Sequence, residues 1–210
     1  MKYLIFLLSV LTVSSISYSQ KIFEGEIIYE LETVKKDSSF DVTQLRAADA
    51  TTTKCIFKNG NFLNLPDAGN LEYYYFNPRA NQIYSKYKSV DTLFYQPGNR
   101  LLASQDSVYT IKLEHNTDTI LGYICNRFVL QSSSLKLTLI YAPQLAVNPE
   151  WFKDTRFSYY DIIYKKTHSI FLKSIAEFDQ FVSILSAKKV IAREVGDSEF
   201  PDISRLPKSL

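Results

Sequence analysis

The side chains that could carry chemistry are few and lie far apart in the sequence. The chain of 210 residues has two histidines, His115 and His168, and two cysteines, Cys55 and Cys125. A zinc site needs three or four ligands close together, usually in short motifs such as Cys-x-x-Cys. A nucleophilic thiol needs a neighbour that lowers its pKa. The sequence shows neither arrangement, so we expect no metal ion and no thiol-dependent catalysis.

Motifs for other kinds of catalysis and for cofactors are missing as well. His168-Ser169 lacks the surrounding residues of a hydrolase nucleophile elbow, and the aspartates lack the spacing of a calcium loop. A phosphate-binding loop needs several glycines together, whereas Gly60, Gly98 and Gly122 stand in separate turns. We expect a protein that is not an enzyme and that uses no cofactor.

The two cysteines have two interpretations that the sequence leaves open. In an oxidising compartment, Cys55 and Cys125 could form a disulfide, which would close a long loop and stabilise the fold by about 4–5 kcal/mol in the entropic model. Alternatively, each is a separate buried thiol on its own strand. The choice depends on the distance between their Cα atoms.

Aromatic side chains are the most distinctive feature of the composition, with 15 Tyr and 14 Phe beside one Trp. Tyr73, Tyr75, Tyr84 and Phe94 are our candidates for a concave apolar pocket that would hold a lipid or another hydrophobic molecule. The alternative is that such rings form core on one face of a sheet and cross-strand pairs on the other.

The elements that must position these side chains are strands. Between residues 23 and 33, Phe23, Ile27, Tyr29 and Leu31 alternate with glutamates, a pattern typical of a half-buried antiparallel strand. Asn59-Gly60 predicts a hairpin between 51–58 and 61–65. We expect further strands at 73–76, 82–88, 92–95, 107–114, 123–131, 135–141, 170–176 and 180–195, with a turn at 116–118.

Helical signals are confined to two segments. A short helix is expected within 44–50, and Pro149 could begin a helical stretch that reaches residue 164, although 157–164 is ambiguous between helix and strand. The fold class is therefore mainly β: a curved antiparallel sheet, forming an open half-barrel with short helices over the concave face. Residues 20–196 would be this single domain, and 197–210 a loose tail.

The N-terminus predicts export. Met1-Lys2 is followed by an apolar run from Tyr3 to Val13 and then by a serine-rich stretch, which together indicate a signal peptide over residues 1–19, cleaved after Ser19. No later segment is long and apolar enough for a membrane span. We expect a periplasmic or secreted protein.

Net charge excludes one class of partner. The chain has 24 basic and 22 acidic residues without a run of either sign. A nucleic-acid-binding protein would need basic residues clustered on one face, so we expect no nucleic acid as partner.

Three short segments carry a family resemblance. The stretch 118–126 (DTILGYICN), the opening strand FEGEIIY at 23–29 and the closing residues AKKV at 187–190 with DSEFP at 197–201 resemble segments of secreted Bacteroidetes proteins. That group is named for a Gly-Leu-Pro-Gly-Leu-Ile (GLPGLI) motif. This chain has Thr167 to Leu172 in place of the motif, which places the resemblance with the broader lipoprotein-carrier-like (Lol-like) relatives. The resemblance implies a curved sheet with helices across its concave side; the cavity of true carriers holds acyl chains.

Two functions are consistent with the sequence. One is a non-catalytic binding or carrier module outside the cytoplasm, with a lipid or other hydrophobic small molecule as its ligand. The other is a structural or protein-interaction component of the cell envelope, whose protein partner the sequence does not identify.

Overall fold

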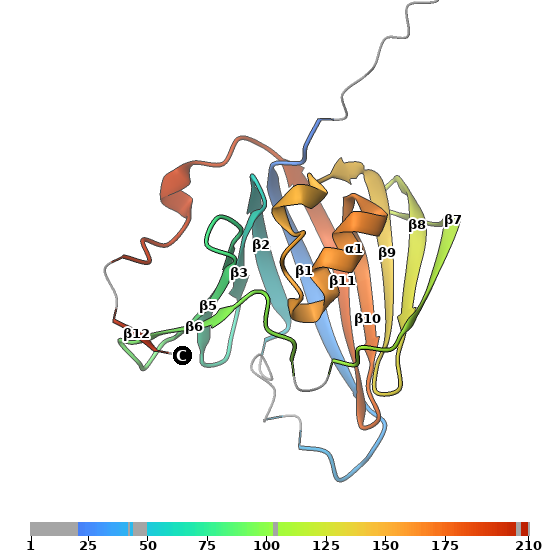
Figure 1. Cartoon of the computed structure of the whole chain (residues 1–210), viewed down its shortest axis with the longest axis horizontal. Helices are drawn as coiled ribbons and strands as arrows, with labels where there is room; N and C mark the ends of the chain where they lie inside the picture. Colours follow the sequence, from blue (N-terminus) through green and yellow to red (C-terminus); the bar gives the residue numbers. More distant parts are fainter. Residues whose placement is uncertain (1–20, 42, 44–49, 103–104, 205–206, 210) are drawn as a thin grey trace, which may run out of the picture.

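The chain folds as one curved antiparallel sheet that wraps around a short helix, as the computed structural model shows (Figure 1). The structure describes residues 21–41, 43, 50–102, 105–204 and 207–209. The predicted signal peptide, residues 1–19, and nearly all of the helix predicted within 44–50 lie outside the described residues. Among the described residues, no helix has the length and hydrophobicity of a membrane-spanning segment.

Twelve strands form the sheet, in the order β12-β6-β5-β4-β3-β2-β1-β11-β10-β9-β8-β7. They are β1 (Gly25–Lys35), β2 (Thr52–Lys58), β3 (Asn61–Pro66), β4 (Leu71–Asn77), β5 (Gln82–Tyr87), β6 (Leu93–Pro97), β7 (Thr110–Ile120), β8 (Tyr123–Gln131), β9 (Lys136–Ala146), β10 (Ser169–Glu177), β11 (Phe181–Ala192) and β12 (Lys208–Ser209).

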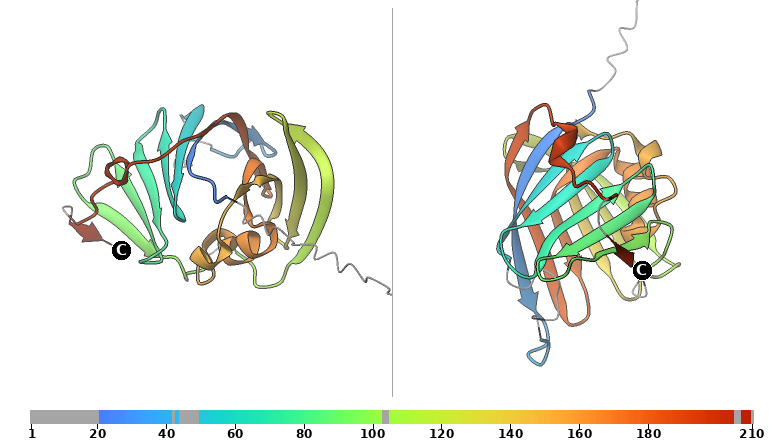
Figure 2. Two further views of the ribbon diagram at one scale, coloured as in Figure 1. Left: turned by 90° about the horizontal axis from the view of Figure 1, so that it is seen from above. Right: turned by 90° about the vertical axis from the view of Figure 1, so that its left-hand side faces the viewer.

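The order consists of two meanders joined in the middle. Strands β1 to β6 are neighbours in chain order, as are β7 to β11, and β1 pairs with β11 to unite them. The connection from β6 to β7 therefore runs between the two ends of the sheet. Figure 2 shows it passing in front of the open side of the curved sheet.

One helical segment covers the concave face. It contains the short 3-10 helices η2 (Pro149–Trp151) and η3 (Phe157–Tyr159) and the helix α1 (Tyr160–Thr167). Figure 2 shows these elements inside the curve of the sheet. The predicted mainly β fold with short helices over its concave face is confirmed, and the ambiguous segment 157–164 is helical.

The strands form where their side chains alternate. In β1, Ile27 and Tyr29 are buried while Glu30 and Glu32 are exposed, so one face of the strand meets the core and the other meets solvent. The Asn59-Gly60 turn has φ angles of 50° and 79°, as a type I′ hairpin requires. A Cβ at Gly60 would also lie 2.8 Å from the Trp151 ring, so only glycine fits under η2.

Strand β7 differs from its prediction. We expected a turn at 116–118, but β7 continues through it and turns at Leu121-Gly122, where φ is 52° and 82°. Asn116, with φ of 51°, instead lies in an irregularity of the β7–β8 pairing. Its backbone N–H donates to Asn126 Oδ1 at 2.9 Å, so the side-chain amide replaces a strand hydrogen bond there.

The C-terminal segment, residues 193–204 and 207–209, also differs from the loose tail that we expected over 197–210. It includes the 3-10 helix η4 (Asp197–Glu199) and β12, which pairs in parallel with β6. Phe200 and Ile203 pack against buried residues of the convex face. The physical reason is that Tyr75, Tyr84 and Leu93 form an apolar surface there that would otherwise face solvent.

Candidate functional site

The candidate site is a cavity between α1 and the sheet, which we call the α1 cavity. It has a volume of about 240 Å³, slightly below the roughly 300–1,000 Å³ usual for drug-sized ligands. Its lining comes from strands β9 to β11, from η3 and α1, and from three connecting segments: Leu102, Gln105, Leu135, Leu137, Leu139, Ser158, Tyr159, Tyr160, Ile163, Tyr164, Phe171, Ser174, Ala176, Phe178 and Leu185.

Strand register places the floor of the cavity on one face. Leu139 pairs with Ser174, and Ser174 pairs in turn with Leu185, so these three side chains lie in a row across β9, β10 and β11. Leu137 and Ala176 form the next row. Because side chains two positions apart share a face, both rows point toward α1.

The roof depends on an unusual backbone at the start of α1. Ser158 and Tyr159 both have left-handed backbone angles, with φ of 51° and 60°. Such angles are costly outside glycine and persist only where the surroundings enforce them. Here the Tyr159 hydroxyl accepts a hydrogen bond from the Asp106 N–H at 3.0 Å, which holds the ring over the sheet.

The Gln105 amide of the lining is occupied by protein partners. Gln105 Oε1 accepts from the N–H groups of Leu102 and Ser158, each at 2.9 Å, and Gln105 Nε2 donates to the Arg156 carbonyl at 2.9 Å. These bonds also tie the β6–β7 connection to η3. Apart from the hydroxyls of its serines and tyrosines, the surface left to a ligand is apolar.

The titratable groups that are buried between α1 and the sheet carry no charge at neutral pH. Burial raises the pKa of the Tyr160 and Tyr164 hydroxyls and that of Tyr29. Burial also raises the pKa of the Cys55 thiol to about 12. All four groups stay neutral, since a charge in such surroundings would lose its hydration.

The structure divides the four predicted pocket residues between the two faces. Tyr75 and Tyr84 lie together on the convex face, where their ring centroids are 6.0 Å apart, and Tyr73 packs against the same cluster. Phe94 pairs with Ser85 and lies on the concave face. The three tyrosines thus meet beneath the C-terminal segment, and none of the four lines the α1 cavity.

Both cysteines are free and buried. Cys55 lies in β2 under α1, and its thiol donates to Asn64 Oδ1 at 3.4 Å. Cys125 lies in β8, where its thiol donates to the Tyr123 carbonyl at 3.3 Å. The strands β1, β11, β10 and β9 separate β2 from β8 in the sheet.

The histidines stand apart from any ligand set. His115 is exposed on β7, and His168 follows α1 with its Nε2 3.0 Å from the Lys165 carbonyl. In the described part of the chain, no three His, Cys, Asp or Glu side chains are grouped so that they could hold a metal ion.

Sequence reasoning missed the residues that line the α1 cavity. The alternation of Leu135, Leu137 and Leu139 was visible in the strand predicted at 135–141, and it is the signal that could have pointed to them. The sequence did not show which face of which strand would lie beneath the helix.

Comparison with known proteins gives a likeness of fold. No family model matches the sequence, and no curated protein matches it. The solved structure of PNGF-II in space group C2 aligns with 84% of this chain at 15% identity and a TM-score of 0.50. This chain covers 29% of that PNGF-II chain.

Two further structures align at lower TM-scores. PNGF-II in space group P21 aligns with 83% of this chain and 30% of its own, at 11% identity and a TM-score of 0.45. The lipoprotein LppX of Mycobacterium tuberculosis aligns with 82% of this chain and 89% of its own, at 10% identity and a TM-score of 0.38. The resemblance to secreted Bacteroidetes proteins stays a prediction.

Proposed function

We propose that the protein is a non-catalytic binding protein of the periplasm or exterior, which holds the apolar part of a lipid or another hydrophobic molecule in the α1 cavity. The observation that carries the proposal is the lining of this cavity. None of its described residues is charged, and all but Gln105, Ser158 and Ser174 have aliphatic or aromatic side chains.

Burial of apolar surface supplies the affinity. Each buried methylene contributes about 0.8 kcal/mol, so the cavity favours a short acyl chain or a ring system over a polar ligand. The predicted signal peptide supports a place outside the cytoplasm.

The test uses N-phenyl-1-naphthylamine, a neutral dye that fluoresces in apolar surroundings. We expect saturable binding to the mature chain, and at least a tenfold loss of affinity in Ala176→Trp, because the indole would fill the cavity beside Leu137. Ala80→Trp, at an exposed alanine between β4 and β5, is the matched control and should bind the dye as the unmodified chain does.

Absence of saturable dye binding to the unmodified chain would reject the proposal, as would equal affinities of Ala176→Trp and Ala80→Trp. Native mass spectrometry of protein purified from its own envelope adds a second readout: we expect a bound mass that leaves on organic extraction.

The alternative function, an interaction component of the envelope, has an observation of its own. Among the described residues, the exposed large hydrophobic side chains include Val108, Leu113, Leu121 and Ile124. All four lie on or beside β7 and β8, at one edge of the sheet. If this edge docks a partner, Leu113→Glu with Ile124→Glu should release the protein from the envelope fraction without changing dye binding.

A further inference from the structure

A second hollow lies on the concave face, beyond the rings that α1 contacts. Tyr160 reaches Phe62 on β3 and Phe76 on β4 through edge-to-face contacts at 5.7 and 6.3 Å. The next strands, β5 and β6, form the wall of a hollow of about 310 Å³. We call it the Arg100 hollow, and the residues that line it are Ile83, Ser85, Tyr87, Phe94, Tyr95, Gln96 and Arg100.

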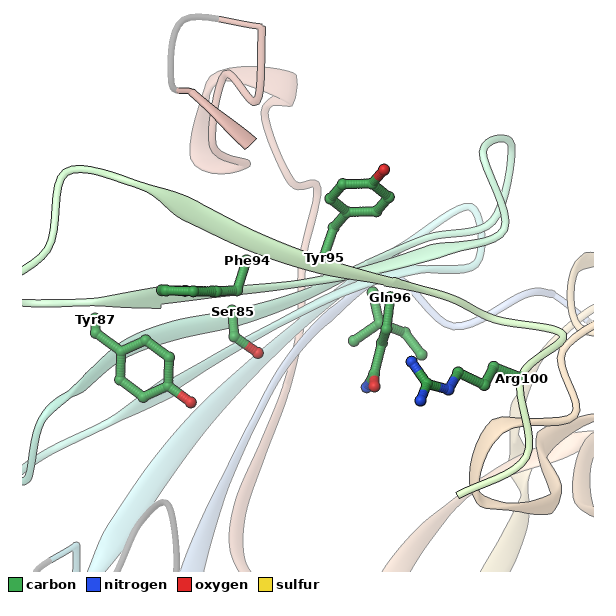
Figure 3. A pocket seen from close by; sticks show the side chains of 7 residues that line it. Ser85, Tyr87, Phe94, Tyr95, Gln96 and Arg100 are labelled. Carbon is green, nitrogen blue, oxygen red and sulfur yellow. The ribbon is translucent and has the colours of Figure 1, made fainter. Parts of the chain in front are cut away.

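Strand pairing explains which side chains enter this hollow. Ile83 pairs with Gln96 and Ser85 pairs with Phe94, so these four side chains share one face. Figure 3 shows Ser85, Tyr87 and Gln96 on that side of the strands and Tyr95 on the other. The hollow therefore opens on the face opposite the tyrosine cluster, and Tyr95 is the lining residue that also packs against that cluster.

One end of the hollow is aromatic. The rings of Tyr87 and Phe94 stand edge to face, with centroids 5.7 Å apart, and both are only half-buried. Partly exposed aromatic rings in a concave site can pack against the apolar part of a ligand.

The other end carries a guanidinium. Arg100 lies just after β6, and Figure 3 shows its side chain directed toward Gln96. Arg127 and Arg193 each contact two carboxylates at 2.6 to 3.2 Å. For Arg100, by contrast, the described chain places no carboxylate within ion-pair distance, and none of the described lining residues is acidic.

We propose that the Arg100 hollow binds a carboxylate with an apolar body. The Arg100 guanidinium and the Gln96 amide donate hydrogen bonds to the carboxylate, in the planar two-point geometry that suits arginine. The ring or chain of the ligand lies against Tyr87 and Phe94. This site does not depend on the α1 cavity, because the two share no lining residue.

The experiment compares an acid with its neutral counterpart. Dissociation constants of 4-phenylbutyrate and 4-phenylbutanol are measured on the mature chain by following the backbone N–H signals of Phe94 and Gln96 in NMR titrations. We expect the acid to bind at least tenfold more tightly than the alcohol. Arg100→Gln should remove this preference, because it removes the positive charge that pairs with the carboxylate.

A matched variant controls for overall charge. Lys166→Gln removes one positive charge from an exposed position at the end of α1 and should keep the preference for the acid. Phe94→Ala should weaken the acid and the alcohol by the same factor, because it removes only the apolar contact.

Laurate distinguishes a free small acid from the head of a lipid. If the affinity for laurate falls in both Arg100→Gln and Ala176→Trp, the ligand is a fatty acid whose chain enters the α1 cavity. If it falls only in Arg100→Gln, the hollow binds the carboxylate by itself. Equal affinities for phenylbutyrate and phenylbutanol, or an unchanged preference in Arg100→Gln, would overturn the proposal, whereas failure of dye binding alone would overturn only the proposed function.

Discussion

The two faces of the sheet are covered in different ways. On the concave face, a continuous segment packs rings into the core: Phe152 stacks on Tyr164 with centroids 3.9 Å apart and on Phe76 at 5.5 Å. On the convex face, the C-terminal segment contacts rings through Phe200, 5.7 Å from Tyr75, and through the Lys208 ammonium, 5.7 Å from the Tyr84 ring. Buried Val195, the short β12–β6 pairing and several ion pairs also hold the segment.

Those ion pairs lie near the surface. Arg193 binds Glu199 at 2.6 Å and Glu26 at 3.1 Å, and Lys58 binds Asp197 at 2.8 Å. An exposed ion pair contributes roughly 0–1 kcal/mol to the free energy of unfolding. Truncating a buried aromatic side chain costs about 3–5 kcal/mol. The concave covering is therefore part of the fold, whereas the convex covering is a local attachment.

The largest effect is expected from Phe76→Ala. Phe76 is fully buried and contacts Phe62, Phe152 and Tyr160, so its loss leaves a cavity that links the sheet to the helical segment. We expect the free energy of unfolding to fall by about 3–5 kcal/mol, measured by urea denaturation. A loss below about 1 kcal/mol would contradict the assignment of the main core to this face.

Phe200→Ala should have a smaller and more local effect. The half-buried ring covers Tyr75, and we expect a loss of about 1–2 kcal/mol that falls on the C-terminal segment. Hydrogen exchange checks this through the Leu93 N–H, which donates to the Pro207 carbonyl at 2.8 Å. Its exchange should accelerate, while the Tyr29 region under α1 keeps its protection.

Arg127→Ala tests the convex face where no segment covers it. Arg127 lies between Glu114 and Asp118, with contacts at 3.2 and 3.1 Å, and its side chain is 37% exposed. We expect a loss of at most about 1 kcal/mol in urea denaturation, and less at high salt. A loss as large as that of Phe76→Ala would contradict the difference between the two faces.

The smallest effect is a change of pH dependence in Asp106→Asn. Hydrogen bonds from the hydroxyls of Ser132, Ser133 and Ser134 lower the pKa of Asp106 to about 2, from an ordinary 3.8. A lowered pKa contributes stability above the ordinary value, and this contribution disappears as the pH falls toward the folded value. Between pH 4 and 2, the stability of Asp106→Asn should therefore fall less steeply than that of the unmodified chain, as thermal melts at stepped pH would show.

Local patterns predicted much of the fold. The alternation in β1 and the Asn59-Gly60 turn identify their elements directly, because period and turn chemistry act over a few residues. The hairpin at Leu121-Gly122 was misplaced because Asn116 also adopts a left-handed angle, and asparagine signals a turn whether or not the strand ends there.

The candidate site was less predictable because it depends on faces and on distant contacts. Tyr75 and Tyr84 lie side by side, but on the convex face and not in the concave pocket that we predicted for them. Phe94 lies one residue out of register with these two tyrosines, so it points to the other face. The α1 cavity requires that Asp106 hold Tyr159 from more than fifty positions away. No local pattern encodes such a contact.

The pairing of β1 with β11 sets the order in which the molecule can form. Gly25 lies opposite Ala192, and every pair of this ladder joins a residue of β1, near the beginning of the chain, to a residue of β11, more than 140 positions later. Each meander can form from neighbouring segments, but their union closes a loop of most of the polypeptide, and such closures slow folding. A ribosome or an export channel that still retains β11 would therefore hold the protein as two incomplete sheets, with the centre of its core exposed until that strand is released.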